Sequence, residues 1–216
     1  INRALEINNT FVLAIKNKIK ILKSLDRLDE ALDFLTKNEP AFEKSTDLMI
    51  ENVDLCIEKI DLRLAFDLNE KVLEREPNNI SALNNKGVIY ERNAKYQFPE
   101  KYMPLALDSF EKVIELDKEF PLGWSNKTVV LMNSSKIDEA GKIIELAYSL
   151  FPKSPDVLNK KGIFLLNIKE PRKALKYFTS ALKKFYRGEF LLNRAQANFQ
   201  INHYEETLKD LERLIS

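Results

Sequence analysis

Histidine, cysteine and glycine are scarce in this sequence, and their scarcity excludes several kinds of chemistry. The 216 residues include one His, one Cys and five Gly. A single cysteine cannot form an internal disulfide or a zinc site built on several thiolates. A nucleophile–base pair would depend on His203 alone, and five scattered glycines form no glycine-rich phosphate loop. We therefore predict a protein that is not an enzyme, with no metal site and no cofactor.

The sequence also lacks a surplus of charge of one sign and any long apolar run. Lys and Arg number 34 against 33 Asp and Glu, which gives a net charge of +1. Nucleic-acid-binding domains generally carry a basic surplus, because phosphate neutralisation supplies most of their affinity. No segment approaches the roughly 18 consecutive apolar residues of a membrane helix, and no secretory signal pattern is present. We predict a cytoplasmic protein that contacts no membrane, and the balanced charge disfavours a nucleic-acid partner.

The sequence does contain a pattern that recurs about every 34 residues. Small residues recur at separations of 34, 41, 34, 34 and 33, at Ala31, Ala65, Ala106, Ala140, Ala174 and Thr207. A second series of apolar residues precedes them at a similar pitch, at Ile15, Met49, Leu83, Trp124, Leu158 and Leu191. Within each series, further apolar residues follow at spacings of four and seven, which place side chains on one face of a helix. Each unit is therefore predicted to contain two helices.

A helix–turn–helix unit of this length resembles the tetratricopeptide repeat. The best match is 121–154, where Trp124 takes the family's aromatic place and Ala140 and Ala147 its small places, and where Pro152 closes the unit. The resemblance covers nearly the whole chain. It implies an all-α fold in which helix pairs stack into one right-handed α-solenoid, with the first helices lining a concave groove.

The repeats depart from the family's pattern at a few places. Thr128 and Val53 stand where Gly is usual, and Asn69 stands where a bulky apolar residue is usual. Basic residues occupy a place that is often apolar, at Lys86, Lys127, Lys161 and Arg194. Cys56 falls at a core place of its repeat, so we expect it to be buried and unreactive.

We divide the chain into a leading remnant and six repeats of one solenoid domain. The remnant is 1–11, and the repeats are 12–45 (the furthest from the family's pattern), 46–79, 80–120, 121–154, 155–187 and 188–216. Because 1–11 resembles the end of a second helix, we expect the chain to be part of a longer protein.

The repeat at 80–120 is seven residues longer than its neighbours, and the extra residues lie near 93–104. We interpret them as a lengthened turn between the two helices. The segment contains Tyr96, Phe98, Tyr102 and Met103. These side chains either pack onto the adjacent helices or form a second contact surface, since aromatic residues and Met are favoured at interface cores.

Two groups of residues are predicted to contact partners. In the groove we expect amides and lysines at equivalent places of the first helices: Asn17, Lys20, Asn84, Asn85, Asn126, Asn159, Lys160, Asn193 and Gln196. Asn carries a donor and an acceptor, so a ladder of Asn residues can pair with the backbone of an extended peptide, as similar Asn residues do in members of the family. These amides can also be simply exposed polar residues. At the C-terminal end an uncovered apolar stripe is predicted to mediate self-association, at Leu208, Leu211, Leu214 and Ile215.

The sequence therefore predicts a protein-interaction scaffold that binds a peptide or another protein in the groove. A homodimer formed through the C-terminal stripe or the groove is the first alternative. An RNA-binding helical repeat is the second, because repeat proteins of similar period read RNA one base per unit.

Overall fold

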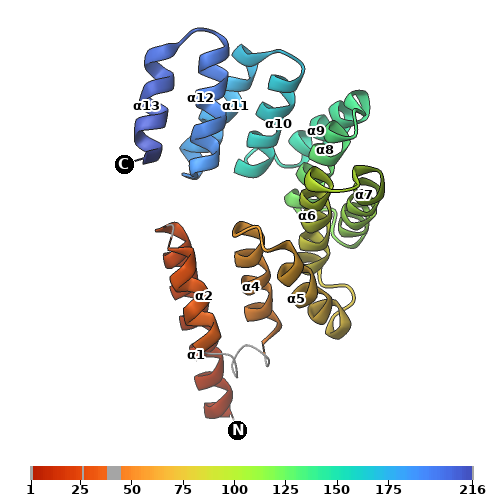
Figure 1. Cartoon of the computed structure of the whole chain (residues 1–216), viewed down its shortest axis with the longest axis vertical. Coiled ribbons are helices and arrows are strands. Elements are labelled where there is room, and N and C mark those ends of the chain that lie inside the picture. The colour runs from red at the N-terminus through yellow and green to blue at the C-terminus, as the bar shows by residue number, and fades with distance from the viewer. Residues whose placement is uncertain (1, 26, 38–44, 216) are drawn as a thin grey trace. The chain divides into compact units, whose positions relative to one another are not determined.

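The computed structural model describes residues 2–25, 27–37 and 45–215, and the regular elements of that part are all α-helices (Figure 1). They form successive pairs of a first and a second helix: α1 (Asn2–Ser24) and α2 (Leu28–Lys37), α4 (Thr46–Glu58) and α5 (Leu62–Arg75), α6 (Ile80–Tyr96) and α7 (Pro99–Leu116), α8 (Pro121–Asn133) and α9 (Ile137–Leu150), α10 (Pro155–Asn167) and α11 (Pro171–Lys184), and α12 (Gly188–Gln200) and α13 (Tyr204–Ile215). The predicted all-α class is confirmed.

The helices belong to two compact units, which we describe separately. Unit 1 is Ile1–Tyr102 and unit 2 is Met103–Ser216, whereas the sequence alone predicts a single domain. In both units, each predicted repeat from residue 46 onward contains one helix pair.

Local side-chain chemistry fixes where many helices begin. The side chains of Ser45, Asp61, Asn79 and Ser154 each accept a hydrogen bond from a backbone N–H in the first turn of the following helix. Such caps satisfy N–H groups that have no partner within the helix. Proline occupies the first turn of α8, α10 and α11, where its missing N–H costs nothing.

The two helices of a pair are joined by a turn with the same backbone geometry in most repeats. Ile60, Ser135, Lys169 and Asn202 all have φ between 61° and 63°. At each of these turns the N–H of the next residue bonds back to a carbonyl near the end of the first helix, as Lys136 N–H does to Leu131 O at 2.9 Å. This arrangement is a Schellman-type helix end, in which glycine is the usual left-handed residue. The repeat thus adopts a strained backbone without glycine, at a cost of about 1 kcal/mol or more for each turn.

Small residues allow neighbouring helices to approach closely. The alanines of the recurring series, from Ala31 to Ala174, have no exposed surface. A Cβ added to Gly162 of α10 would lie 2.4 Å from the ring of Phe178 in α11, which is itself fully buried. A small residue at this place therefore permits close packing of α10 against a large neighbour in α11.

The extra residues near 93–104 do not form the lengthened turn that we predicted. Helices α6 and α7 have 17 and 18 residues, whereas α8 and α9 have 13 and 14. Only Gln97 and Phe98 separate α6 from α7. The insertion is therefore helical, because Asn93–Tyr96 contains no helix breaker and Pro99 sits at the start of α7, where proline is tolerated.

The predicted boundary between 1–11 and 12–45 is also absent. Helix α1 runs without a break from Asn2 to Ser24. This segment contains neither Gly nor Pro, so nothing in it stops a helix between residues 11 and 12. The end of the predicted first repeat, 38–44, and the side chains of residues 1–10 and 24 lie outside the described residues.

Candidate binding surfaces

The predicted groove amides of unit 2 are largely engaged in hydrogen bonds between repeats. Asn159 in α10 is 1% exposed. Its Nδ2 donates to Glu189 Oε1 at 3.2 Å, and its Oδ1 accepts a hydrogen bond from Asn193 Nδ2 at 3.0 Å. Both partners lie in α12, one repeat further along the chain. Asn159 therefore joins neighbouring repeats and is not available to a ligand.

A similar contact joins α4 to α6 in unit 1. Asn85 is buried, and its Nδ2 donates to Asp54 Oδ1 at 2.6 Å. Burial raises the pKa of the Asp54 carboxyl, and the charge of Lys23 and the hydrogen bond from Asn85 act in the opposite direction. Asn84, next to Asn85, is buried as well. The amides at these two places are thus part of the repeat interface.

Other predicted groove residues remain accessible on the first helices. In unit 2, Asn126, Lys160 and Asn193 lie at equivalent places of α8, α10 and α12 and form a polar row. Gln196 forms a second row with Val129 and Ile163, which occupy the equivalent places of α8 and α10. We call these two rows the first-helix face. All are half-buried except Gln196, which is exposed. In unit 1, Asn17 and Lys20 of α1 are exposed.

The four residues of the aromatic segment do not share one surface. Tyr96 and Phe98 are exposed, whereas Met103 is buried. Tyr102 is half-buried and stacks on Tyr90 of α6, with ring centroids 6.0 Å apart. Tyr102 thus packs onto the adjacent helix, and only Tyr96 and Phe98 are presented to solvent.

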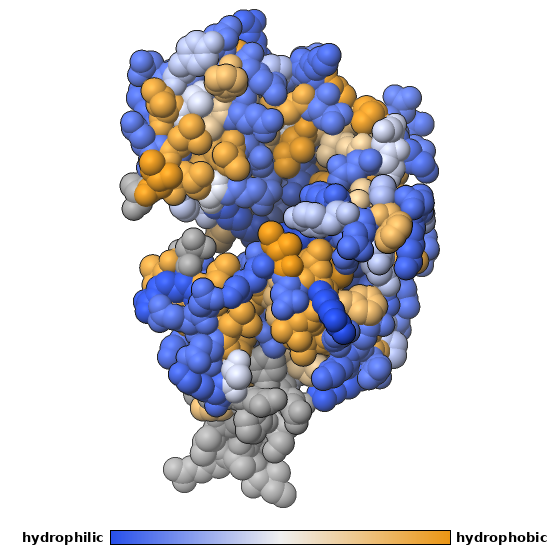
Figure 2. All heavy atoms as spheres, viewed as in Figure 1, coloured by the Kyte–Doolittle hydropathy of each residue, from blue (hydrophilic) through white to orange (hydrophobic). Residues whose placement is uncertain are grey.

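The predicted C-terminal stripe is an exposed apolar face of α13. Leu208 and Ile215 are 53% and 85% exposed, and Leu211 and Leu214 between them are partly exposed. Apolar side chains gather over α13 in Figure 2. Among the described residues no further helix packs on this face.

The basic residues that replace an apolar place of the family pair with acidic residues 16 positions away. The pairs are Lys86–Glu70 at 2.9 Å, Lys127–Glu111 at 2.8 Å, Lys161–Glu145 at 2.8 Å and Arg194–Asp210 with an N–O distance of 2.8 Å. The first three join a first helix to the second helix before it, and the fourth joins α12 to the helix that follows. We did not predict these pairs, although their constant spacing is visible in the sequence.

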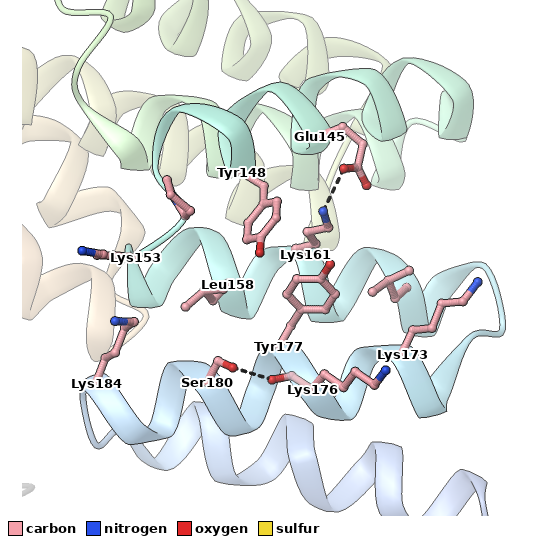
Figure 3. Close-up of a pocket in the computed structure, with 12 residues that line it drawn as sticks. Glu145, Tyr148, Lys153, Leu158, Lys161, Lys173, Lys176, Tyr177, Ser180 and Lys184 are labelled. Carbon is pink, nitrogen blue, oxygen red and sulfur yellow. Dashed lines mark hydrogen bonds and ion pairs between the residues drawn. The ribbon is translucent and has the colours of Figure 1, made fainter.

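A cleft in unit 2, also not predicted, lies between α9, α10 and α11 and has a volume of about 690 Å³ (Figure 3). Its centre holds Lys161, whose Nζ lies 3.8 Å and 4.9 Å from the ring centroids of Tyr148 and Tyr177. The two rings meet edge to face at 5.4 Å. Cation–π contacts of this kind stabilise a lysine that is removed from water, so the centre of the cleft is a fixed structure.

The single cysteine and the single histidine belong to different units. Cys56 is buried, and burial is the main reason that the pKa of its thiol rises to about 11. His203 is exposed in the turn before α13. The described residues contain no group of three or more His, Cys, Asp or Glu that could hold a metal ion. In the same part of the chain, no helix has the length and apolar character needed to cross a membrane.

Comparison with known proteins finds similar arrangements of helix pairs. Residues 68–97 match the tetratricopeptide repeat model. A thermophilic tetratricopeptide-repeat protein of Thermus thermophilus is similar in structure, with a TM-score of 0.73 and 15% identity over 86% of this chain and 99% of that one. A tetratricopeptide repeat protein of Parabacteroides merdae has a TM-score of 0.69 and 15% identity over 93% and 76% of the two chains. For PilF of Pseudomonas aeruginosa the TM-score is 0.61, with 16% identity over 96% and 91%.

No curated protein sequence matches the chain significantly. At identities of 15–16% the structural matches concern the fold. Together with the paired helices, they show that the chain has an all-α helical-repeat solenoid fold similar to that of tetratricopeptide-repeat proteins, and the family's repeat model matches it at 68–97.

Proposed function

We propose that this protein is an interaction scaffold that binds a peptide or a partner protein along the first-helix face of unit 2. Repeat proteins of this kind generally present extended surfaces to other proteins. The observation that carries the proposal is the pair of accessible rows on α8, α10 and α12, which combine amides and a lysine with aliphatic side chains.

The hydrogen bonds within the face define which groups remain for a ligand. Asn193 uses its Nδ2 for Asn159, which leaves its Oδ1 as an acceptor. Among the described residues, the Gln196 amide has no partner, so it offers both a donor and an acceptor. Lys160 lies 3.2 Å from Glu189 and keeps further N–H groups. Val129 and Ile163 add apolar contact beside these polar groups.

The test is capture of partners from an extract of the source cells on the immobilised chain. In the variant Asn126→Arg/Gln196→Arg, two long charged side chains would block both rows, and we expect partner proteins to be lost from the retained set. The matched control Leu116→Arg/Ser149→Arg adds the same charge at exposed positions of the second helices α7 and α9. If the first variant retains the same proteins as the control, the proposal fails.

Self-association is a second candidate, and the exposed apolar face of α13 favours it. A stripe of four apolar side chains is more than the scattered exposed residues of an ordinary surface. Solution mass should then rise with protein concentration, and Leu208→Asp/Ile215→Asp should abolish that rise. A constant monomer mass for the unmodified chain would exclude this candidate.

A further inference from the structure

The cleft between α9, α10 and α11 concentrates positive charge in a chain whose total charge is nearly balanced. Helix α11 carries five basic residues and no acidic one. Five lysines line the cleft, against one glutamate. The net charge of the whole chain is only +1, so this basic surplus is local.

Three of the cleft lysines have no anionic partner within the part of the protein that the structure describes. Lys161 pairs with Glu145, and Lys173 lies 3.2 Å from Glu170. Lys153, Lys176 and Lys184, by contrast, are not fully buried and have no ion-pair partner among those residues. Unpaired ammonium groups at the edge of a concave surface attract and orient an anionic partner.

The positions of these lysines argue against a small, compact anion. Lys153 and Lys184 lie at one end of the cleft, and Lys173 and Lys176 lie at the other (Figure 3). A single phosphate would require cations that converge on one point. Charges spread along the length of the cleft fit an extended chain that carries several negative groups.

The residues at the centre of the cleft favour a peptide ligand over a nucleic acid. Lys161 occupies the faces of Tyr148 and Tyr177, which are the surfaces on which bases would stack. The lining includes no arginine but does include Pro152 together with the two tyrosine rings, whereas Leu158 and Leu165 of the lining are buried. Apolar contacts between cationic ends suit a segment in which acidic and aliphatic side chains alternate.

We infer that this cleft binds an acidic peptide segment of a partner protein, with carboxylates paired to Lys153, Lys176 and Lys184 and aliphatic side chains over the centre. This surface is formed by α9, α10 and α11 and is distinct from the two rows of the first-helix face. Its test therefore does not depend on the proposed function.

The experiment measures fluorescence anisotropy of a fluorescein-labelled peptide of alternating Glu and Leu with the full chain at low salt. We expect binding that weakens as salt is raised, because exposed charge pairs are screened. The variant Lys153→Glu/Lys176→Glu/Lys184→Glu should bind about tenfold more weakly, given the modest contribution of each exposed pair. The control variant Lys71→Glu/Lys112→Glu/Lys118→Glu changes the net charge equally at lysines outside the cleft, and it should bind like the unmodified chain.

Each other outcome overturns the inference. The idea fails if the unmodified chain does not bind the peptide, if both charge-reversal variants lose binding equally, or if a peptide with Gln in place of Glu binds as well. Tighter binding of a labelled oligouridine, lost in the cleft variant, would assign the cleft to RNA instead.

Discussion

The first-helix face and the cleft of unit 2 are both lined by polar residues, but those residues have different roles. On the first-helix face, Asn193 donates a hydrogen bond to the buried Asn159 beneath it, and Asn159 also bonds to Glu189. In the cleft, Lys176 and Lys184 stand without an anionic partner among the described residues. The same stacking of repeats therefore produces an interface whose amides have hydrogen-bond partners within the protein and a cleft in which some lysines have no anionic partner.

This difference shows how to interpret polar residues that recur in a helical repeat. A recurring amide at the contact between repeats supplies buried polar groups with the hydrogen-bond partners that water would otherwise provide. Its recurrence then reflects the architecture of the stack. Charges without an anionic partner inside the described part of the protein, such as those of the cleft lysines Lys153, Lys176 and Lys184, are better indicators of a ligand.

The largest effect is expected from the packing between α10 and α11, beneath both surfaces. Phe178→Ala should lower the free energy of unfolding by about 3–5 kcal/mol, because it leaves a cavity at a fully buried position. Gly162→Ala should cost about 1–3 kcal/mol by overpacking against the same ring. Denaturant unfolding followed by Trp124, the single tryptophan, in α8 of unit 2, measures both.

A double variant checks whether these two effects share one cause. If Gly162 is small because of the Phe178 ring, Gly162→Ala should cost less in a Phe178→Leu background than alone. Strictly additive losses would show that the glycine is needed for another reason.

The amide interface is expected to give the next largest effect. Asn159→Ala should lower the free energy of unfolding by about 1–3 kcal/mol, since Glu189 and Asn193 would lose their buried partner. Gln196→Ala on the same face should change it by less than about 0.5 kcal/mol, because Gln196 is exposed. Equal effects of the two substitutions would remove the distinction between interface and ligand-facing amides.

The two residues of the ion pair at the centre of the cleft should differ in how much their removal lowers the free energy of unfolding. The side chain of Lys161 is 6% exposed, whereas that of Glu145 is 62% exposed. Glu145→Ala leaves a buried charge without its partner and should cost about 1–2 kcal/mol. Lys161→Met leaves only an exposed carboxylate and should be nearly neutral. The reverse order, measured by urea unfolding, would contradict the view that Lys161 is held by its surroundings.

A smaller, pH-dependent effect is expected at the amide interface of unit 1. Burial raises the pKa of Asp54 in the folded chain, so the folded state binds more protons than the unfolded state. Stability should therefore rise as the pH falls through the raised pKa toward the ordinary value of 3.8. Asp54→Asn, which can still accept from Asn85, should be more stable than the unmodified chain near neutral pH.

Urea unfolding followed by circular dichroism at several pH values measures that difference. The advantage of Asp54→Asn should shrink on acidification, as the unmodified carboxyl becomes protonated. A difference that does not change with pH would show that burial of the charged carboxylate is not its source.

The repeat architecture could be predicted from the sequence because its signals are local. The spacing of small residues such as Ala140 predicted the helix pairs, and these alanines lie buried between helices. The insertion was misjudged because its length alone does not say whether extra residues form a turn or extend the helices. The interaction role, the partner and the cytoplasmic location stay predictions beyond what the fold decides.

The burial and the hydrogen-bond partners of individual polar residues could not be predicted, because they depend on neighbours one repeat away. Asn69 stands where the family usually has a bulky apolar residue. It is fully buried, and its side chain donates a hydrogen bond to Ala82 O at 3.0 Å. Asn159 and Lys160 are both polar residues predicted to line the groove, yet Asn159 is buried and Lys160 is half-buried. The cleft joins residues of three helices, and its unpaired lysines are recognisable only after the ion pairs have been assigned.

Site-specific photocrosslinking tests the central claim, binding of a partner on the first-helix face, most directly. A benzophenone side chain would be placed at Gln196 on that face and, as a control, at the exposed Leu116 on α7, and each chain would be irradiated in cell extract. We predict partner adducts from position 196 and none from position 116. Equal adducts from both positions, or adducts from position 116 alone, would contradict the proposal.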